Sequence, residues 1–128
     1  MIKLRDPKPA ASSDVCKVKY TDEKQVKAVQ KAMISDEVAY NLAEAFKILS
    51  DPTRIKIIHA LSKAELCVCD MSALLGLHDP VVSHHLRLLR ALKLVKYRRA
   101  GRMAFYSLDD EHIEKLFQQG LEHVLERR

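Results

Sequence analysis

Two short helical patterns, separated by only three residues, constrain the fold of this chain most. The first covers residues 69–75 and ends at Gly76, a residue that often closes a helix in the left-handed conformation. Asp79-Pro80 then opens a second helix, whose inward positions are Val82, His85, Leu86, Leu89 and Leu92. Two helices joined by a glycine-containing turn, the second of them basic on its outer face, predict a helix-turn-helix.

The spacing of the apolar residues changes directly after the second helix. In residues 94–108, Val95 and Tyr97 alternate with Lys96 and Arg98, and Gly101 lies near the middle of the segment. This alternation predicts a β-hairpin with a basic tip. A hairpin that follows a helix-turn-helix is a wing, so the predicted fold class is mainly α with a β-hairpin wing, a winged helix-turn-helix.

Further helical patterns flank this unit. We expect helices that begin after caps at Thr21, Ser35 and Asp51, and a last helix over residues 109–128. One stripe of the last helix is apolar, and a second copy of the chain is the simplest surface to cover it, which predicts a homodimer through the terminal helices. The stripe consists of Ile113, Leu116, Phe117, Leu121, Val124 and Leu125.

Positive charge is concentrated in the predicted second helix and hairpin. Residues 80–108 contain seven Lys and Arg and no Asp or Glu. Such a block is typical of a surface that binds a polyanion, although an ordinary solvated face would look the same. On double-stranded DNA, the outward residues of the helix would enter the major groove and the hairpin would contact phosphates. The groove residues would be Ser83, His84 and Arg87, and the phosphate residues Lys96, Arg98, Arg99 and Arg102.

Length and composition set further bounds. The chain has 128 residues, of which 48% are hydrophobic, so it can bury a core of its own. Residues 1–20 lack apolar periodicity, and we expect a flexible N-terminal arm followed by one DNA-binding and dimerisation domain over residues 21–128. No apolar run approaches the roughly 20 residues of a membrane span, and no secretory signal is evident. We therefore expect a cytoplasmic protein whose three cysteines remain thiols.

Several motifs together resemble the ArsR/SmtB family of bacterial metal-sensing repressors. They are residues 49–54 (LSDPTR), 65–70 (ELCVCD), 82–87 (VSHHLR), 95–102 (VKYRRAGR) and 106–108 (YSL). The likeness covers about residues 38–126, and the Cys-Val-Cys hexapeptide is similar to the CadC-like branch that senses cadmium, lead or zinc. It implies a homodimeric winged helix-turn-helix repressor that leaves its operator DNA when metal binds.

Three cysteines predict a soft-metal site. Cys67 and Cys69 can both turn toward one cation where the backbone is not yet helical, although a Cys-x-Cys pair alone is better explained by burial. The resemblance implies that Cys16 on the arm reaches the cysteine pair of the other subunit. Similar sensors carry a second arm cysteine at the position of Tyr20, so at most three thiolates are available here. Three suffice for Pb(II), or for Cd(II) or Zn(II) completed by water, Asp14 or another oxygen.

The last helix offers a second set of ligands in Asp110, His112, His123 and Glu126. His112 and His123 are about 16 Å apart along a helix, far more than the roughly 2 Å bonds of a shared ion allow. Two antiparallel copies would instead bring Asp110 and His112 of one chain to His123 and Glu126 of the other, a set typical of zinc. The same set matches the interfacial zinc site of the family. Acids that only serve the helix dipole, beside surface histidines, are the alternative.

These patterns, together with the family resemblance, imply a metal-responsive transcriptional repressor. It would bind operator DNA as a homodimer, release it on binding Zn(II), Cd(II) or Pb(II), and so control metal efflux or sequestration genes. A thiol-based redox or persulfide sensor that uses the same cysteines is the alternative. An enzyme is not expected, because the chain lacks Cys-x-x-Cys, a glycine-rich phosphate loop and His-Glu-x-x-His. A metal buffer without a DNA role would leave the acid-free basic block unexplained.

Overall fold

The computed structural model describes residue 18 and residues 20–126. The chain divides between Tyr40 and Asn41 into two compact units. Most of the expected N-terminal arm, with Cys16 and Asp14, lies outside the described residues. Within these residues, no helix is both long enough and apolar enough to cross a membrane.

The first unit contains helix α1 (Glu23–Ala32) and the beginning of α2 (Asp36–Leu49). Asp22 caps α1, because its carboxylate accepts the Gln25 N–H at 3.1 Å; the predicted cap at Thr21 was wrong by one residue. Ser35 precedes α2 as predicted, and its Oγ accepts the Val38 N–H at 3.1 Å. Neither helix buries a residue within the single chain.

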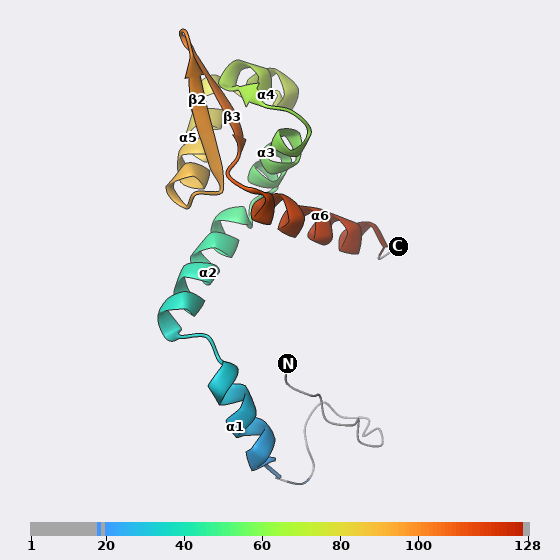
Figure 1. The fold of residues 1–128 in the computed structure, drawn as a ribbon. Coiled ribbons are helices and arrows are strands. Elements are labelled where there is room, and N and C mark those ends of the chain that lie inside the picture. Colours follow the sequence, from blue (N-terminus) through green and yellow to red (C-terminus); the bar gives the residue numbers. More distant parts are fainter. Residues whose placement is uncertain (1–17, 19, 127–128) are drawn as a thin grey trace. The chain divides into compact units, whose positions relative to one another are not determined.

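The second unit contains the predicted helix-turn-helix and wing (Figure 1). Its elements are the end of α2, then α3 (Pro52–Lys63), β1 (Leu66–Cys67), α4 (Val68–Leu75), α5 (Asp79–Ala91), β2 (Val95–Ala100), β3 (Met103–Leu108) and α6 (Glu111–Glu126). Helices α4 and α5 form the helix-turn-helix, and β2 and β3 form the wing. Gly76 closes α4 in the left-handed conformation, with φ of 67°, which is the role its place in the sequence predicts.

The three strands form one antiparallel sheet in the order β1-β3-β2. The sequence did not predict β1, which is two residues long and pairs Leu66 with Tyr106 and Cys67 with Phe105. Strand β3 is therefore the central strand. As a result, the first cysteine of the Cys-Val-Cys motif is hydrogen-bonded into the same sheet as the wing.

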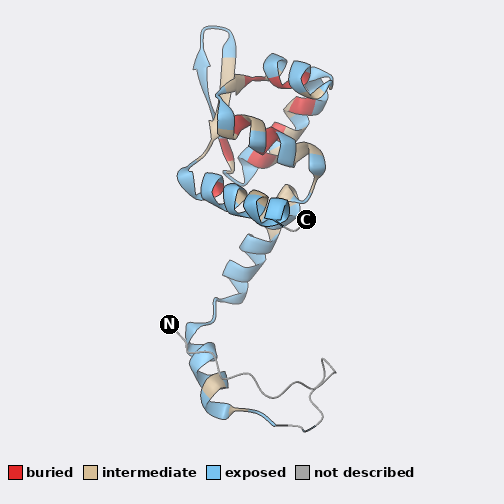
Figure 2. Ribbon diagram, turned by 90° about the vertical axis from the view of Figure 1, so that its right-hand side faces the viewer, coloured by how far each residue is buried: buried red, intermediate tan, exposed pale blue. Residues whose placement is uncertain are grey.

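The core lies between α3, α4, α5 and the start of β2 (Figure 2). Most of the predicted inward face of α5 is buried, but Leu92 is 37% exposed and follows the end of the helix, so its inward placement was wrong. His85 is only half-buried, and desolvation lowers the pKa of its imidazole. The core residues are Ile57, Ile58, Leu61, Met71, Val82, Leu86, Leu89 and Val95.

Candidate DNA-binding and metal-binding surfaces

The outer face of α5 is available to a partner along most of its length. Val82, Leu86 and Leu89 are fully buried, and this fixes the rotation of the helix on the core. His84 and Arg87 are consequently exposed, and Ser83 is half-buried at the edge of the face. A helix fixed in this way presents one polar side, the arrangement that a major groove requires.

Arginines gather around an aromatic side chain on the wing. The guanidinium carbon of Arg90 lies 4.8 Å from the centre of the Tyr97 ring, and that of Arg99 lies 5.9 Å from it. Tyr97 itself stands 5.4 Å from the ring of Tyr106 on the central strand. Arg90 was absent from the predicted DNA-binding set, although its spacing of three residues from Arg87 places the two on one face of the helix. Lys96 and Arg102 are exposed on the same hairpin.

Arg98 differs from the other basic residues of the wing. Its guanidinium makes a two-pronged ion pair with Glu65, with Nη2 at 2.7 Å from Oε1 and Nε at 2.9 Å from Oε2. The same guanidinium lies 5.2 Å from the centre of the Phe105 ring. The hydrogen bond from Arg98 lowers the pKa of Glu65, and that bond raises the pKa of Arg98. A phosphate contact by Arg98 stays a prediction, and DNA would have to compete with Glu65 for it.

The two cysteines of the Cys-Val-Cys motif have different environments. Cys67 is 5% exposed, has an extended backbone (φ −88°, ψ 172°) and donates its N–H to the Asp70 carboxylate at 3.2 Å. Cys69 is the second residue of α4 and is exposed. Its thiol donates to Oδ2 of Asp79, the first residue of α5, at 3.8 Å.

The environment of Cys69 favours the protonated form of its thiol. The negative charge of Asp79 is the main cause that raises the pKa of Cys69, followed by desolvation and the charge of Cys67. A cation reverses this effect, because it stabilises the thiolate and the carboxylate together. The thiol of Cys69 and the carboxylate of Asp79 are therefore donors of the kind that a divalent metal ion takes.

The start of α6 brings two of the predicted ligands together. Asp110 Oδ1 accepts the N–H groups of His112 at 2.9 Å and of Ile113 at 3.2 Å, and Oδ2 lies 3.4 Å from His112 Nδ1. The hydrogen bond from Ile113 is the main cause that lowers the pKa of Asp110. Asp110 thus caps the helix, as expected if it stabilises the helix N-terminus and binds no metal. Its second carboxylate oxygen, Oδ2, still lies beside the imidazole of His112, so the two side chains could bind one metal ion together.

His123 and Glu126 lie exposed at the other end of α6. Within residue 18 and residues 20–126, no group of three His, Cys, Asp or Glu side chains is placed to hold a metal ion. A complete site at either position therefore needs a ligand from outside these residues or from another chain.

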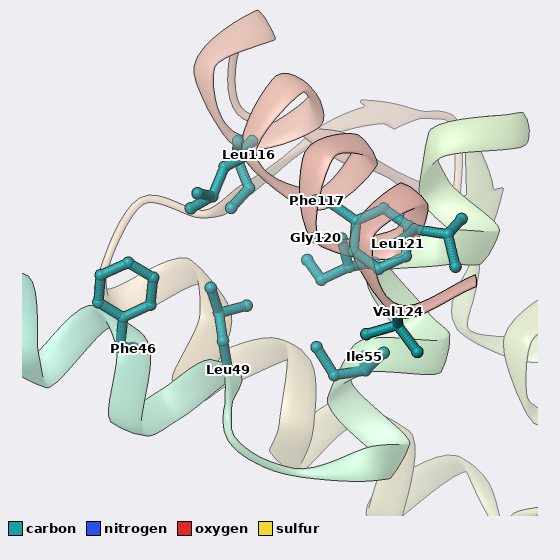
Figure 3. Close-up of a pocket in the computed structure, with 10 residues that line it drawn as sticks. Phe46, Leu49, Ile55, Leu116, Phe117, Gly120, Leu121 and Val124 are labelled. Carbon is teal, nitrogen blue, oxygen red and sulfur yellow. The ribbon is translucent and has the colours of Figure 1, made fainter. Parts of the chain in front are cut away.

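An apolar groove lies between the end of α2, α3 and α6 (Figure 3). It has a volume of about 480 Å³, and we call it the α6 groove. Leu116 and Val124, which line it, are 46% and 61% exposed in the single chain. Within the predicted apolar stripe of the last helix, Ile113 is therefore buried in the single chain, whereas Leu116 and Val124 are exposed along the groove. The lining residues are Phe46, Leu49, Ile55, Ile58, Ile113, Leu116, Phe117, Gly120, Leu121 and Val124.

Known proteins share both the sequence and the fold. Residues 51–97, from the start of α3 to the middle of β2, match the family described as bacterial regulatory protein, arsR family. The transcriptional repressor SmtB homolog of Synechocystis sp. is 44% identical over 102 residues, which are 80% of this chain and 77% of the relative. The cadmium resistance transcriptional regulatory protein CadC homolog of Staphylococcus aureus is 40% identical over 116 residues, which are 90% of this chain and 95% of the relative.

A solved structure supports the same architecture. The homodimeric winged helix-turn-helix DNA-binding domain of a possible ArsR-family transcriptional regulator from Mycobacterium bovis superimposes with a TM-score of 0.69 at 24% identity. The superposition covers 74% of this chain and 91% of that domain. At this identity the likeness concerns the fold alone, and it agrees with the winged helix-turn-helix predicted from the sequence.

Proposed function

The chain belongs to the ArsR family of bacterial regulatory proteins, and we propose that it is a cytoplasmic repressor that binds operator DNA as a homodimer and releases it when Zn(II), Cd(II) or Pb(II) binds. The genes under its control would encode metal efflux or sequestration. Close relatives with names that refer to cadmium resistance and to repression support the general function. The Cys67-Val-Cys69 motif and its position support the choice of metals.

One observation carries the proposal: the cysteine motif touches both parts of the predicted DNA-binding surface. Cys67 pairs with Phe105 on the central strand of the wing sheet. Cys69 contacts Asp79 at the start of α5. A metal held at this motif would therefore be linked to the wing through the strand pairing of Cys67 and to α5 through the hydrogen bond of Cys69. A shift of the motif on metal binding would move the wing and α5 directly.

The DNA contacts divide by chemistry. Ser83, His84 and Arg87 on α5 would face base edges in the major groove, and Lys96, Arg99 and Arg102 on the wing would contact phosphates. Arg90 joins the phosphate set, because Tyr97 holds it beside Arg99. Arg98 would contribute once its pair with Glu65 opens.

A second copy of the chain is the proposed occupant of the α6 groove. Leu116, Val124 and Leu125 leave about half of their surface in water in the single chain, and burial of such side chains is the main driving force for stable association. Antiparallel α6 helices would place Asp110 and His112 of one subunit near His123 and Glu126 of the other. These residues would hold Zn(II) with nitrogen and oxygen ligands, once on each side of the two-fold axis.

For the repressor to respond to metal, the free energies of metal binding and of operator binding must be coupled. Coupling free energies between sites are typically about 1–3 kcal/mol, or 5- to 150-fold in affinity. Linkage is reciprocal, so the operator weakens metal binding by the same factor. Cys16, Cys67 and Cys69 would supply the thiolates of the regulatory site, and the bound ion would supply the positive charge that keeps all three deprotonated.

The redox or persulfide alternative is less well supported by the environment of the thiols. Reactive cysteines are exposed and have a lowered pKa. Cys67 is buried, and the carboxylate of Asp79 raises the pKa of Cys69. Neither cysteine of the motif has the surroundings of a reactive thiol, so metal sensing is the function that we favour.

An operator titration tests the proposal. The full chain, stripped of metal with a chelator, is titrated into a fluorescent duplex that carries the intergenic DNA upstream of its own gene, and anisotropy is recorded. We expect tight binding without metal and an affinity loss of about tenfold or more with at least one of Zn(II), Cd(II) and Pb(II), which corresponds to about 1.4 kcal/mol of coupling. If none of the three ions weakens binding, or if the metal-free protein does not bind, the proposed function is wrong.

A further inference from the structure

Another hollow of the second unit lies between α3, β1 and the end of α4, and the two helices are side by side in Figure 1. It has a volume of about 510 Å³, and we call it the α3 pocket. This volume is within the range of roughly 300–1,000 Å³ that is typical of small-molecule sites. Its lining residues differ from those of the α6 groove and do not include the cysteine motif.

One wall of the α3 pocket is apolar. Leu66 of β1 and Leu75 of α4 are half-buried and pack against the core. Leu74 is 62% exposed, so it keeps most of its surface in water beside them. On α3, the short side chains of Ala60 and Ala64 also line the pocket. A ligand with an apolar part would be stabilised here, because it would remove these surfaces from water.

The α3 side of the pocket is basic. Lys56 and Lys63 line it together with His59, and no Asp or Glu does. Helix α3 contains no acidic residue at all. Glu65, which follows Lys63 by two positions, is held by its ion pair with Arg98. Within the described residues, no ion pair involves either lysine of the pocket.

Lysines that only balance the dipole of α3 are the alternative explanation. Lys63 is in the last turn of the helix, where about half a unit of negative charge is concentrated. Lys56 is in the second turn, and the effect of the dipole does not extend that far from the C-terminus. Two full positive charges therefore exceed what the end of the helix requires. The pocket is left with an excess of positive charge that an anion can neutralise.

His59 connects the α3 pocket with α6. Its ring is stacked on that of Phe117, with 5.7 Å between the ring centres and 28° between the planes. Phe117 in turn lines the α6 groove, where Figure 3 labels it. A ligand that contacts the imidazole therefore changes the surroundings of a residue in the groove. The imidazole can also donate a hydrogen bond to an anion.

We infer that the α3 pocket binds a small amphipathic carboxylate, such as a medium-chain fatty acid. The carboxylate would lie between the two lysines, and the chain would cover the leucines of β1 and α4. Both parts of the ligand are needed, because exposed ion pairs alone contribute little in water and a short anion has no apolar surface to bury. The inference goes beyond the proposed function and requires neither metal nor DNA.

Octanoate is the probe that tests this site, with acetate and 1-octanol as its two halves. Full-length, metal-free protein labelled with ¹⁵N and with ¹³C in the leucine methyl groups is titrated with each, and NMR chemical shifts are recorded. We expect octanoate to give saturable shifts of the methyl groups of Leu74 and Leu75 and of the amide of Phe117. Acetate should bind more than about tenfold more weakly, because it lacks the chain, and 1-octanol about fivefold more weakly, because it lacks the charge.

A pair of charge variants tests the two lysines. Lys56→Gln/Lys63→Gln should weaken octanoate binding about fivefold, because two exposed ion pairs are lost. Lys24→Gln/Lys47→Gln removes the same charge from α1 and α2, at exposed positions that do not line the pocket, and should stay within about twofold of the unmodified protein. All four lysines are exposed, and thermal unfolding without ligand verifies that both variants fold.

Three results would overturn the inference. Equal octanoate affinities of the two double variants would show that the pocket does not recognise the charge. Acetate that binds as tightly as octanoate would show an adventitious ion on surface lysines only. If octanoate leaves the pocket resonances unchanged but dilution of the protein shifts them, a second copy of the chain covers the pocket. None of these results bears on the proposed function, which the operator titration tests separately.

Discussion

The two candidate metal regions differ in how much of each lies within one chain. At the cysteine motif, Cys67 is paired with the wing sheet and Cys69 contacts Asp79 at the start of α5, so a ligand bound there would act directly on the proposed DNA-binding surface. At α6, Asp110 and His112 lie together, but His123 and Glu126 lie more than two turns further along the helix. The first region is suited to moving elements within a subunit. The second is suited to fixing the arrangement of two subunits.

The largest expected effect is the loss of Cd(II) binding at the cysteine motif while Zn(II) binding at α6 is retained. In a Cys67→Ser/Cys69→Ser double variant, Cd(II) should lose its charge-transfer absorption and more than about 100-fold in affinity, because both thiolates are gone. Zn(II) binding at α6 should remain, since that region contains no sulfur ligand. Ultraviolet absorption and competition with a chelator measure both. Loss of α6 zinc in the same variant would show that the two regions are not independent.

Mixed dimers test whether the α6 region is shared. Homodimers of His112→Ala or of His123→Ala should each lose both α6 zinc sites. A dimer of one His112→Ala chain and one His123→Ala chain should lose both histidines from one site and keep the other intact, which gives one tightly bound Zn(II) per dimer. A Cys67→Ser/Cys69→Ser background removes the thiolate contribution from the count. Zero zinc per mixed dimer, or tight zinc in a forced monomer, would contradict the antiparallel arrangement.

Within the wing, Arg99 and its neighbour Arg98 allow a direct comparison of an arginine that forms no ion pair among the described residues with one that is paired to a carboxylate. Arg99→Ala should weaken DNA binding nearly uniformly across sequences and lower the salt slope of the affinity by about one, because a phosphate contact is lost. Arg98→Ala should lower the slope less, because part of its charge is already neutralised by Glu65. Anisotropy titrations at several salt concentrations give both slopes. Equal slopes would show that DNA displaces Glu65 completely.

The smallest effect concerns the ion pair itself. Arg98 lowers the pKa of Glu65, so the pair stabilises the fold above the ordinary pKa of a glutamate and this contribution is lost as pH falls through the lowered value. Glu65→Gln should therefore unfold at a slightly lower temperature than the unmodified protein at neutral pH, and the difference should vanish in acid. The pair is exposed, so the effect is small. Thermal unfolding followed by circular dichroism across the acid range measures it, and a difference that grows in acid would contradict the assigned sign.

The local signals in the sequence predicted most of the fold. Gly76 and Asp79-Pro80 place the helix-turn-helix because capping depends on a few neighbouring residues. The start of α1 was wrong by one residue, since Thr21 and Asp22 are both good caps and only the geometry decides between them. Strand β1 could not be predicted, because two residues carry no periodicity and their pairing partners lie 40 and 38 residues further along the chain.

The chemistry of the sites followed the same rule. The candidate ligands on α6 were named from their residue types and from the resemblance, and helical spacing showed that the two pairs cannot meet within one chain. Metal binding by them stays a prediction. The pair of Arg98 with Glu65 joins residues 33 positions apart, and that of Cys69 with Asp79 joins residues 10 positions apart. Nothing in the local sequence indicates which of several nearby carboxylates meets a given side chain. Those contacts depend on how the helix-turn-helix and the sheet pack together.

The strand order β1-β3-β2 has a consequence for solubility. Because β3 is central, one edge of β2 is left without a neighbouring strand within the described sheet. An open edge of this kind can pair with the edge of another chain and start aggregation, and natural proteins oppose this with charged side chains. Strand β2 carries Lys96, Arg98 and Arg99, whose like charges repel a second copy of the same edge. The basic residues that we assign to DNA therefore also protect the wing against edge-to-edge aggregation.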